Sequence, residues 1–248
     1  MVEHPGFVVD RSPDRTTLER RSGEAIGEAL REALDRQKKV RVVFASAASQ
    51  SGTLAVLLAS EGIDWSRVEA FHMDEYIGLP AGHDSGFGNW LNDRLFARLP
   101  QMTARLIVPG PDAEAETERY AQLLAEAPID LVCLGIGVNG HIAFNDPPVA
   151  DFNDPKRVKV VELDLVCRQQ QVDDGAFATV ADVPTHAITL TVPQLMEGKR
   201  LICVVPGAAK ADAVYRTIHG PIETACPSSI LRRHADCRLF VDRESCPQ

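Results

Sequence analysis

The sequence predicts an α/β fold: a doubly wound, mostly parallel, Rossmann-like sheet with helices on both faces and a lid insertion. Apolar runs of strand length alternate with segments of helical spacing along the whole chain. The strand-length runs are almost continuously apolar, which is typical of strands covered on both faces in a parallel sheet. With 248 residues, of which 45% are hydrophobic and 25% charged, we expect a single domain over residues 1–248.

The expected elements follow one another from the N-terminus. A helix is predicted over Thr16–Gln37, where apolar residues recur at helical spacing. A buried strand follows at Val40–Phe44, and after a loop an apolar helix runs over Leu54–Ala59. Helices are expected between most of the later strands. Those strands are Val68–Phe71, Arg105–Val108, Ile129–Leu134, His186–Val192, Arg200–Val205 and Arg238–Val241.

One long stretch, Asp151–Val183, interrupts this alternation. It is polar, with three consecutive glutamines at residues 169–171 and an Asp-Asp-Gly turn at residues 173–175. Loops of this length inside compact domains often serve as lids, so we predict a lid over residues 151–183. A surface excursion without a function fits the sequence equally well.

Composition and charge narrow the function classes. Lys and Arg number 26 against 35 Asp and Glu, a net charge of −9, which disfavours nucleic acid and anionic membranes as partners. The N-terminus has no apolar core of signal-peptide length, and no apolar run approaches membrane-spanning length, so a cytoplasmic location is expected. The sequence leaves the oligomeric state open, a homo-oligomer included.

The cysteines and histidines give no sign of a metal. Six cysteines are scattered without any C-x-x-C spacing, and the histidines lack H-E-x-x-H or comparable spacing. We therefore expect no metal, no disulfide framework and no cofactor.

The most informative segment is residues 129–148, IDLVCLGIGVNGHIAFNDPP. Its apolar half predicts a buried strand, and Gly135, Gly137 and Gly140 permit a tight turn with close backbone approach to a ligand. Ligands of open α/β sheets bind beyond the carboxyl ends of the strands, where His141 and Asp146 follow. Taken alone, a glycine-rich loop whose histidine serves only its own backbone is an equally good interpretation.

A second polar cluster follows the Val68–Phe71 strand. Asp74 and Glu75 come at its end, before Gly78 and Pro80 break the chain into a loop. Side chains alternate along extended backbone, so only one of these acids can face a given pocket, and we select Asp74. An isolated Asp-Glu pair after a strand is more often a solvated turn.

Together the two segments resemble the glucosamine-6-phosphate deaminase family. FHMDEYIGLP at residues 71–80 is similar to its acid-bearing loop, and GVNGHIAFNDP at residues 137–147 to its ring-opening histidine loop. The resemblance covers nearly the whole chain and implies this fold and a sugar phosphate as the small-molecule partner. The related 6-phosphogluconolactonases share the fold and a Gly-His turn but differ after the histidine and at the acid loop.

The resemblance also implies roles for individual residues. His141, oriented by Asp146, would open the sugar ring, because imidazoles commonly exchange protons near neutral pH. Asp74 would move the C2 proton to C1 in an aldose–ketose isomerisation, and water would then displace ammonium. Backbone N–H groups near Gly137 and Asn139 would stabilise the enolate oxygen.

A phosphate site is expected where helices begin, because free N–H groups and the helix dipole favour an anion there. The candidates are the turn formed by Ser49, Gln50, Ser51 and Gly52, and the Pro206–Lys210 turn, with Lys210 supplying the charge. An ordinary solvated lysine is the alternative for Lys210.

Several of these positions depart from the family pattern. The family usually has Thr-Gly-Gly-Thr-Pro where this chain has Ala48–Gly52, so the paired glycines are missing. Gln171 stands where the family tends to have a phosphate-binding arginine, with Arg168 one turn away. Asp146 replaces a glutamate, and some members have aspartate in place of Asn139. These differences bear on the substrate rather than on the fold.

Three functions from different classes remain open. A deaminating isomerase would release ammonia from an amino sugar phosphate. A lactonase would use His141 to activate water and would release none. A non-catalytic sugar-phosphate sensor would keep the fold alone, but it would not need both Asp74 and His141.

Overall fold

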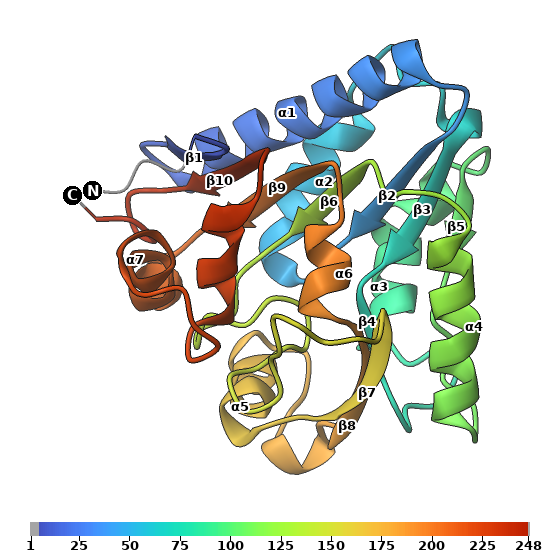
Figure 1. The fold of residues 1–248 in the computed structure, drawn as a ribbon, viewed down its shortest axis with the longest axis vertical. Coiled ribbons are helices and arrows are strands. Elements are labelled where there is room, and N and C mark those ends of the chain that lie inside the picture. The colour runs from blue at the N-terminus through green and yellow to red at the C-terminus, as the bar shows by residue number, and fades with distance from the viewer. Residues whose placement is uncertain (1–4, 248) are drawn as a thin grey trace.

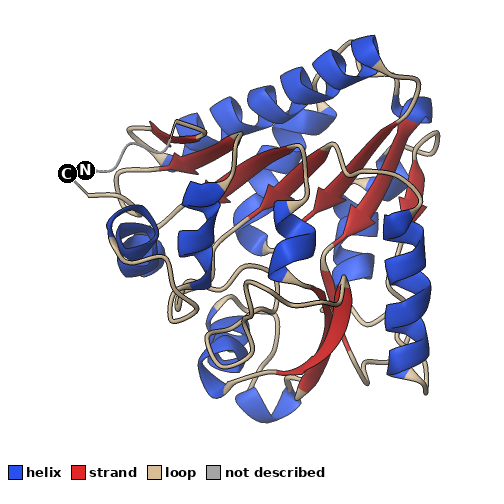
Figure 2. Ribbon diagram, viewed as in Figure 1, coloured by secondary structure: helices blue, strands red, loops and turns tan. Residues whose placement is uncertain are grey.

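A seven-stranded parallel sheet forms the centre of the molecule in the computed structural model, which describes residues 5–247 (Figures 1 and 2). The strand order is β1-β10-β9-β6-β2-β3-β5, and each neighbouring pair is parallel. The order reverses direction between β6 and β2, and ligands of such sheets bind where the order switches. The strands are β1 (Phe7–Arg11), β2 (Val40–Phe44), β3 (Val68–His72), β5 (Thr103–Arg105), β6 (Leu131–Leu134), β9 (Arg200–Val205) and β10 (Cys237–Val241).

Helices cover both faces of this sheet. Alternate strand residues separate into two apolar clusters: Val42 and Phe44 pack with α1, α2 and α3, whereas Val43 packs with α4, α6 and α7. The doubly wound prediction is therefore confirmed. The helices are α1 (Arg15–Arg36), α2 (Ser51–Leu58), α3 (Phe87–Arg94), α4 (Ala113–Ala125), α5 (Leu165–Asp173), α6 (Val192–Met196) and α7 (Ala211–His219), with 3-10 turns η1 (Ala48–Gln50), η2 (Trp65–Arg67), η3 (Phe96–Arg98), η4 (Val180–Asp182), η5 (Ala208–Lys210) and η6 (Pro227–Arg233).

A second, antiparallel sheet lies beyond the carboxyl ends of the central strands (Figure 2). Its order is β4 (Asp74–Tyr76), β8 (His186–Leu190) and β7 (Val158–Glu162). The chain passes from β3 into β4 through Met73 alone, whose carbonyl accepts a 2.8 Å hydrogen bond from Leu190 N. This connection brings the acid-bearing segment to the edge where the central strands end.

The region predicted as a lid is largely regular structure. Residues 151–183 contain β7, which pairs with β8 over its whole length, and α5, whose N-cap Asp164 accepts a hydrogen bond from Cys167 N. A lid insertion is therefore not confirmed. The polar composition of α5 instead places glutamines on one side of a cavity.

Some of the predicted strands match the structure, and others differ from it in position or in partner. Val40–Phe44 and Arg200–Val205 are confirmed to the residue. The strand expected at Arg105–Val108 lies earlier in the chain, as β5. The strand expected at His186–Val192 is β8 of the antiparallel sheet, whose other strands, β4 and β7, were not predicted. Each missed strand is short or carries charged residues, as in Asp74–Tyr76, so its apolar signal is weak.

Candidate active site

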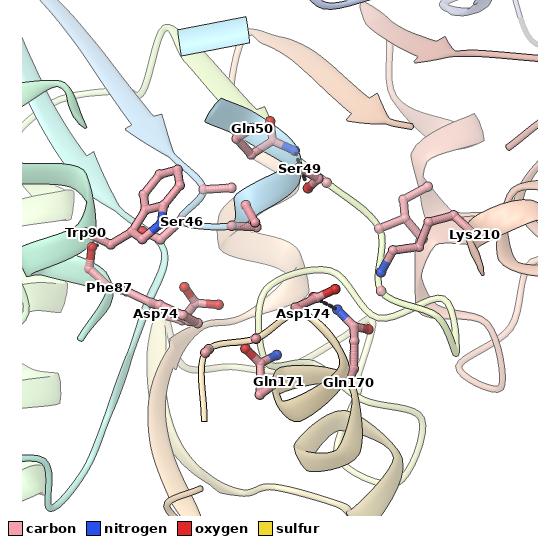
Figure 3. Close-up of a pocket in the computed structure, with 18 of the residues that line it drawn as sticks. Ser46, Ser49, Gln50, Asp74, Phe87, Trp90, Gln170, Gln171, Asp174 and Lys210 are labelled. Atoms are coloured by element: carbon pink, nitrogen blue, oxygen red, sulfur yellow. Dashed lines mark hydrogen bonds between the residues drawn. The ribbon is translucent and has the colours of Figure 1, made fainter. Parts of the chain in front are cut away.

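A cavity of about 810 Å³ opens at the carboxyl edge of the central sheet (Figure 3). Four of its walls are the segments that follow β2, β3, β6 and β9, since parallel strands end at the same edge. One side of α3 and the C-terminal part of α5 also line the cavity. In the close-up, Asp74 and Lys210 lie on opposite sides, with Gln171 and Asp174 between them.

Asp74 reaches this cavity as the first residue of β4 and is only 6% exposed. Burial raises the pKa of its carboxyl well above the usual range, and the nearby charges of Glu75 and Asp146 raise it further. Glu75 points the other way and accepts hydrogen bonds from Phe87 N at 2.9 Å and Gly88 N at 2.8 Å. The alternation expected from the sequence holds, and Glu75 fixes the start of α3.

His141 lies on the same cavity and is held by two polar neighbours. Its Nδ1 lies 2.9 Å from Asp146 Oδ1, so Nε2 is the ring nitrogen left for a ligand. Asn139 donates to Asp146 Oδ1 at 2.8 Å, and its own Oδ1 accepts from His141 N at 3.0 Å. Burial acts to raise the pKa of Asp146, but the His141 charge and hydrogen bonds from its neighbours outweigh burial and lower it. Asp146 therefore stays an anion behind the imidazole.

The glycines of this loop make room for the histidine. A Cβ on Gly137 would lie 2.1–2.3 Å from three atoms of the His141 ring, so no side chain fits there. Gly140 has φ +89, a conformation that favours glycine, but it does not line the cavity. The Gly137 N–H donates to the His141 carbonyl, and Asn139 is outside the cavity wall. The Gly137 N–H is therefore engaged within the loop, and the expectation that N–H groups near Gly137 and Asn139 stabilise the enolate oxygen stays a prediction.

The far end of the cavity holds the expected anion-site residues, with one exception. Ser49, Gln50 and Lys210 line it, whereas Ser51 begins α2 and does not. Gln50 Nε2 donates to Val204 O at 3.1 Å and to Ser49 Oγ at 3.3 Å, which ties the loop after β2 to β9. Burial lowers the pKa of Lys210, and the charge of Asp174 opposes that shift.

Arg168 does not occupy the anion site. Its Nη2 donates to the carbonyl oxygens of Val180 and Val183 at 2.6 and 2.8 Å, so the guanidinium braces its own segment. Gln171, three residues further along α5, does line the cavity. The expected lid arginine is therefore replaced by an uncharged amide.

Sequence reasoning missed several lining residues. Gln170 accepts a hydrogen bond from Val138 N and donates to Asp174, which joins α5 to the histidine loop. Asp174 adds an acid at the anion end, and Arg94, stacked on Trp90 at 4.4 Å, lies at the rim. The Asp-Asp-Gly turn was a visible signal for Asp174, but polar turns are too common to single it out.

The fold and site define an α/β protein in which an acid after β3 and a histidine after β6, the two strands that flank β2, line one cavity. The family model described as "Glucosamine-6-phosphate isomerases/6-phosphogluconolactonase" matches residues 13–240, and the chain belongs to this family. A glucosamine-6-phosphate deaminase from Listeria monocytogenes is 35% identical over 84% of this chain and 87% of its own. One from Bacillus thuringiensis is 34% identical over 90% of this chain and 83% of its own.

Solved structures show the same fold. A structure described as a monomeric glucosamine-6-phosphate deaminase has a TM-score of 0.87 and 27% identity, covering 96% of this chain and 98% of its own. A 6-phosphogluconolactonase from Thermotoga maritima has a TM-score of 0.78 and 19% identity, covering 95% of this chain and 99% of its own, a likeness of fold alone. Within residues 5–247, no helix has the length and apolarity needed to cross a membrane.

Proposed function

We propose that the protein is a deaminating aldose–ketose isomerase that converts glucosamine 6-phosphate and water to fructose 6-phosphate and ammonia in the cytoplasm. The observation that carries the proposal is that Asp74 and His141, from different strand ends, line one cavity. The relatives at 34–35% identity support the substrate class. A sugar lactone hydrolase needs no carboxylate at C2, so it leaves Asp74 without a role.

His141 performs the first step. Its Nε2 shuttles a proton between the ring oxygen and the anomeric hydroxyl, because Nδ1 faces Asp146. The neighbouring carboxylate stabilises the imidazolium that forms transiently. Ring opening exposes an aldehyde at C1 and makes the C2 proton acidic.

Asp74 performs the second step. The carboxylate takes the C2 proton and returns it to C1, which gives the ketose imine. Burial raises the pKa of the Asp74 carboxyl, which makes its carboxylate a stronger base than an exposed aspartate. Water then adds to C2 and ammonia leaves.

We place the substrate phosphate at Lys210 and Ser49, because Lys210 lies across the cavity from Asp74 (Figure 3). Lys210 supplies the point charge and the Ser49 hydroxyl a hydrogen bond. The Asp174 carboxylate interacts with the charge of Lys210, so this part of the cavity carries less net positive charge than a lysine and an arginine together would supply.

Incubation of the purified protein with glucosamine 6-phosphate tests the proposal. We expect ammonia and fructose 6-phosphate to appear in equal amounts. Hydrolysis of 6-phosphogluconolactone without ammonia release would identify a lactonase instead. Saturable sugar-phosphate binding with neither reaction would identify a sensor.

A further inference from the structure

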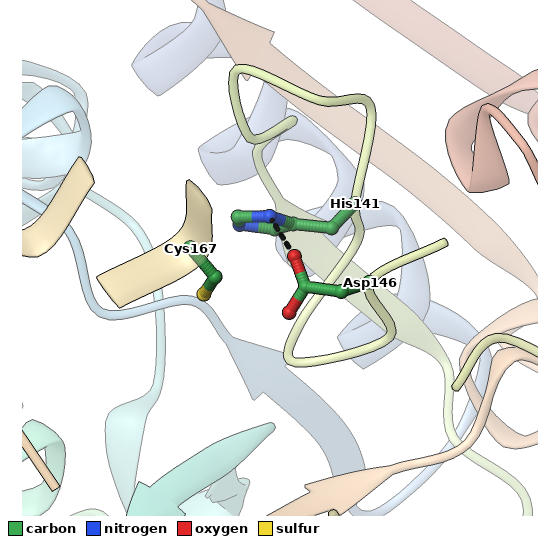
Figure 4. Close-up of side chains that lie close together, drawn as sticks. All are labelled: His141, Asp146 and Cys167. Atoms are coloured by element: carbon green, nitrogen blue, oxygen red, sulfur yellow. Dashed lines mark ion pairs between the residues drawn. The ribbon is translucent and has the colours of Figure 1, made fainter. Parts of the chain in front are cut away.

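Three side chains of metal-ligating types lie close together beside the cavity, and His141 among them lines it (Figure 4). His141 and Asp146 come from the loop after β6, and Cys167 from the first turn of α5. One donor atom of each lies within 4.8 Å of the other two. All three residues are buried, and Cys167 is fully so.

Two atoms of the cluster lack a hydrogen-bond partner. His141 Nδ1 lies 2.9 Å from Asp146 Oδ1 as an ion-pair contact, but neither Nδ1 nor Asp146 Oδ2 makes a hydrogen bond of good geometry. The Cys167 thiol is the remaining donor beside the Asp146 carboxylate, whose side chain is 1% exposed. Buried polar atoms are normally satisfied, so both are available to a ligand.

We propose that this cluster binds a thiophilic divalent cation, zinc above all, and that the bound ion inhibits the enzyme. A thiolate, an imidazole nitrogen and a carboxylate form a donor set that suits zinc. Tetrahedral zinc needs ligand atoms about 2.0–2.3 Å from the ion, and a cluster of this size closes around one with small side-chain shifts. A fourth position is left for water.

The inhibition follows from the tautomer of His141. An ion bound at Nδ1 leaves the remaining ring hydrogen on Nε2, the nitrogen that faces the cavity. That nitrogen then has no lone pair with which to accept the ring-opening proton. The ion also takes the Asp146 carboxylate away from its role beside the imidazole.

Access and selectivity follow from the surroundings. The His141 side chain is 11% exposed and lines the cavity, so an ion can enter past its ring. A thiol must lose its proton to bind zinc, so zinc affinity should increase with pH. Magnesium, which prefers oxygen ligands in an octahedron, does not fit this set.

Direct binding tests the inference without reference to the reaction. Titration of the metal-free protein with zinc chloride in a calorimeter should show one site. Cobalt(II) in its place should give the absorption of a thiolate-to-cobalt charge transfer. Cys167→Ser should weaken zinc binding by more than the roughly 10- to 100-fold that loss of an outer-sphere partner costs.

Cys226→Ser is the matched control, because Cys226 is another buried cysteine beside the same loop, with Sγ 2.7 Å from where a Gly140 Cβ would lie. It should bind zinc as the wild type does. Equal zinc affinity in the wild type and Cys167→Ser, or a cobalt complex without the thiolate band, would overturn the inference. The cobalt spectrum of the wild type decides the matter even if Cys167→Ser does not fold.

Activity supplies a separate readout, which depends on the proposed function. Zinc should stop ammonia release in the wild type, and a chelator should restore it. Cys167→Ser should need a higher zinc concentration for half-maximal inhibition, when each protein is compared with its own uninhibited rate. Zinc binding without inhibition would overturn the inhibitory role. Absence of any deaminase activity would count against the proposed function and leave the binding result standing.

Discussion

At the scale of single residues, Asp74 and Lys210 divide the cavity between proton transfer and anion binding. Asp74 is buried beside two other carboxylates, which raises its pKa, whereas Lys210 is a half-buried cation whose charge interacts with the Asp174 carboxylate. Neither side chain is replaceable by a neighbour, because Glu75 is committed to α3 and Arg168 to the carbonyls of its own segment. Substitutions at these positions should therefore separate turnover from binding.

Asp74→Asn should reduce the kcat for ammonia release by about 10²- to 10⁴-fold, the usual contribution of a positioned acid or base. The amide keeps the shape of the side chain but cannot take a proton from C2. Asp93→Asn, at an exposed acid that also lines the cavity, is the control and should keep the wild-type rate. Near wild-type turnover in Asp74→Asn would remove the residue from the mechanism.

Lys210→Ala should raise KM steeply for the phosphorylated sugar and hardly at all for the sugar without phosphate. Loss of a charge-assisted contact costs about 1.5–3 kcal/mol, or roughly 10- to 150-fold in affinity. Steady-state kinetics on both sugars make the comparison. An equal rise in KM on both would show that Lys210 does not bind the phosphate.

Asp174→Asn should have the opposite effect. This variant removes the repulsion between the Asp174 carboxylate and the substrate phosphate. At an effective dielectric constant of about 20, that repulsion across the cavity is worth about 1 kcal/mol, so KM for the phosphorylated sugar should fall by on the order of fivefold. Asparagine keeps the hydrogen bond from Gln170. A higher KM in this variant would mean that Asp174 itself contacts the substrate.

At the scale of elements, the loop after β6 positions His141 partly because Gly137, which has no side chain, leaves room for the imidazole ring. Gly137 contacts the imidazole directly, and Asn139 bridges the backbone of His141 to the Asp146 carboxylate. Gln170 attaches α5 to the same loop through Val138 N. The orientation of the ring is therefore a property of the whole loop.

Gly137→Ala should test this dependence. The added methyl group would overlap the ring, and displacement of a reacting group by about 1 Å can cost on the order of 10²-fold in rate. The backbone of Gly137 is not in the left-handed region, so thermal melting should show a folded protein. Gly110→Ala is the matched control, because a Cβ there meets nothing within 4 Å. Full activity in Gly137→Ala would mean that the loop yields freely.

Sequence patterns predicted most strands of the central sheet, because the apolar runs of those strands are nearly continuous. They missed the edge strand β1, which ends in two charged residues, and they placed β5 too late in the chain. They also missed β4, which has two acids among three residues, and β7, which contains a lysine and a glutamate. The Asp74 and His141 positions were predictable from motifs at strand ends. Gly137, Gln170 and Cys167 were not assigned their contacts, because these contacts join segments that only the folded chain brings together.

At the scale of the whole molecule, the buried side chain of His72 makes the stability of the fold depend on pH. It is the last residue of β3, is fully buried, and its Nε2 accepts a 2.7 Å hydrogen bond from Ile107 N. Nε2 must therefore be unprotonated in the folded protein. Burial lowers the pKa of His72 to about 3.

Stability should consequently fall in acid. Unfolded chains bind this proton below pH about 6.5, but the folded protein binds it only near pH 3, so the contribution of His72 is complete above 6.5 and is lost as pH falls. The expected slope in that window is about 1.4 kcal/mol per pH unit. Urea unfolding of His72→Gln, whose amide oxygen can accept from Ile107 N, should show a shallower slope between pH 6 and 4. Identical slopes would contradict the assignment.

β1 and β10, which are far apart in the sequence, pair at one edge of the central sheet (Figure 1). During synthesis on the ribosome, Phe7–Arg11 is made before residues 12–236, and its partner Cys237–Val241 follows them. The nascent protein therefore carries an unpaired strand while all of these residues are made, and unpaired strand edges recruit other chains. A polypeptide that stops before residue 237 lacks β10, so β1 and one edge of β9 have no partner strand. We expect such a polypeptide to aggregate, which is a more serious consequence than its loss of catalysis.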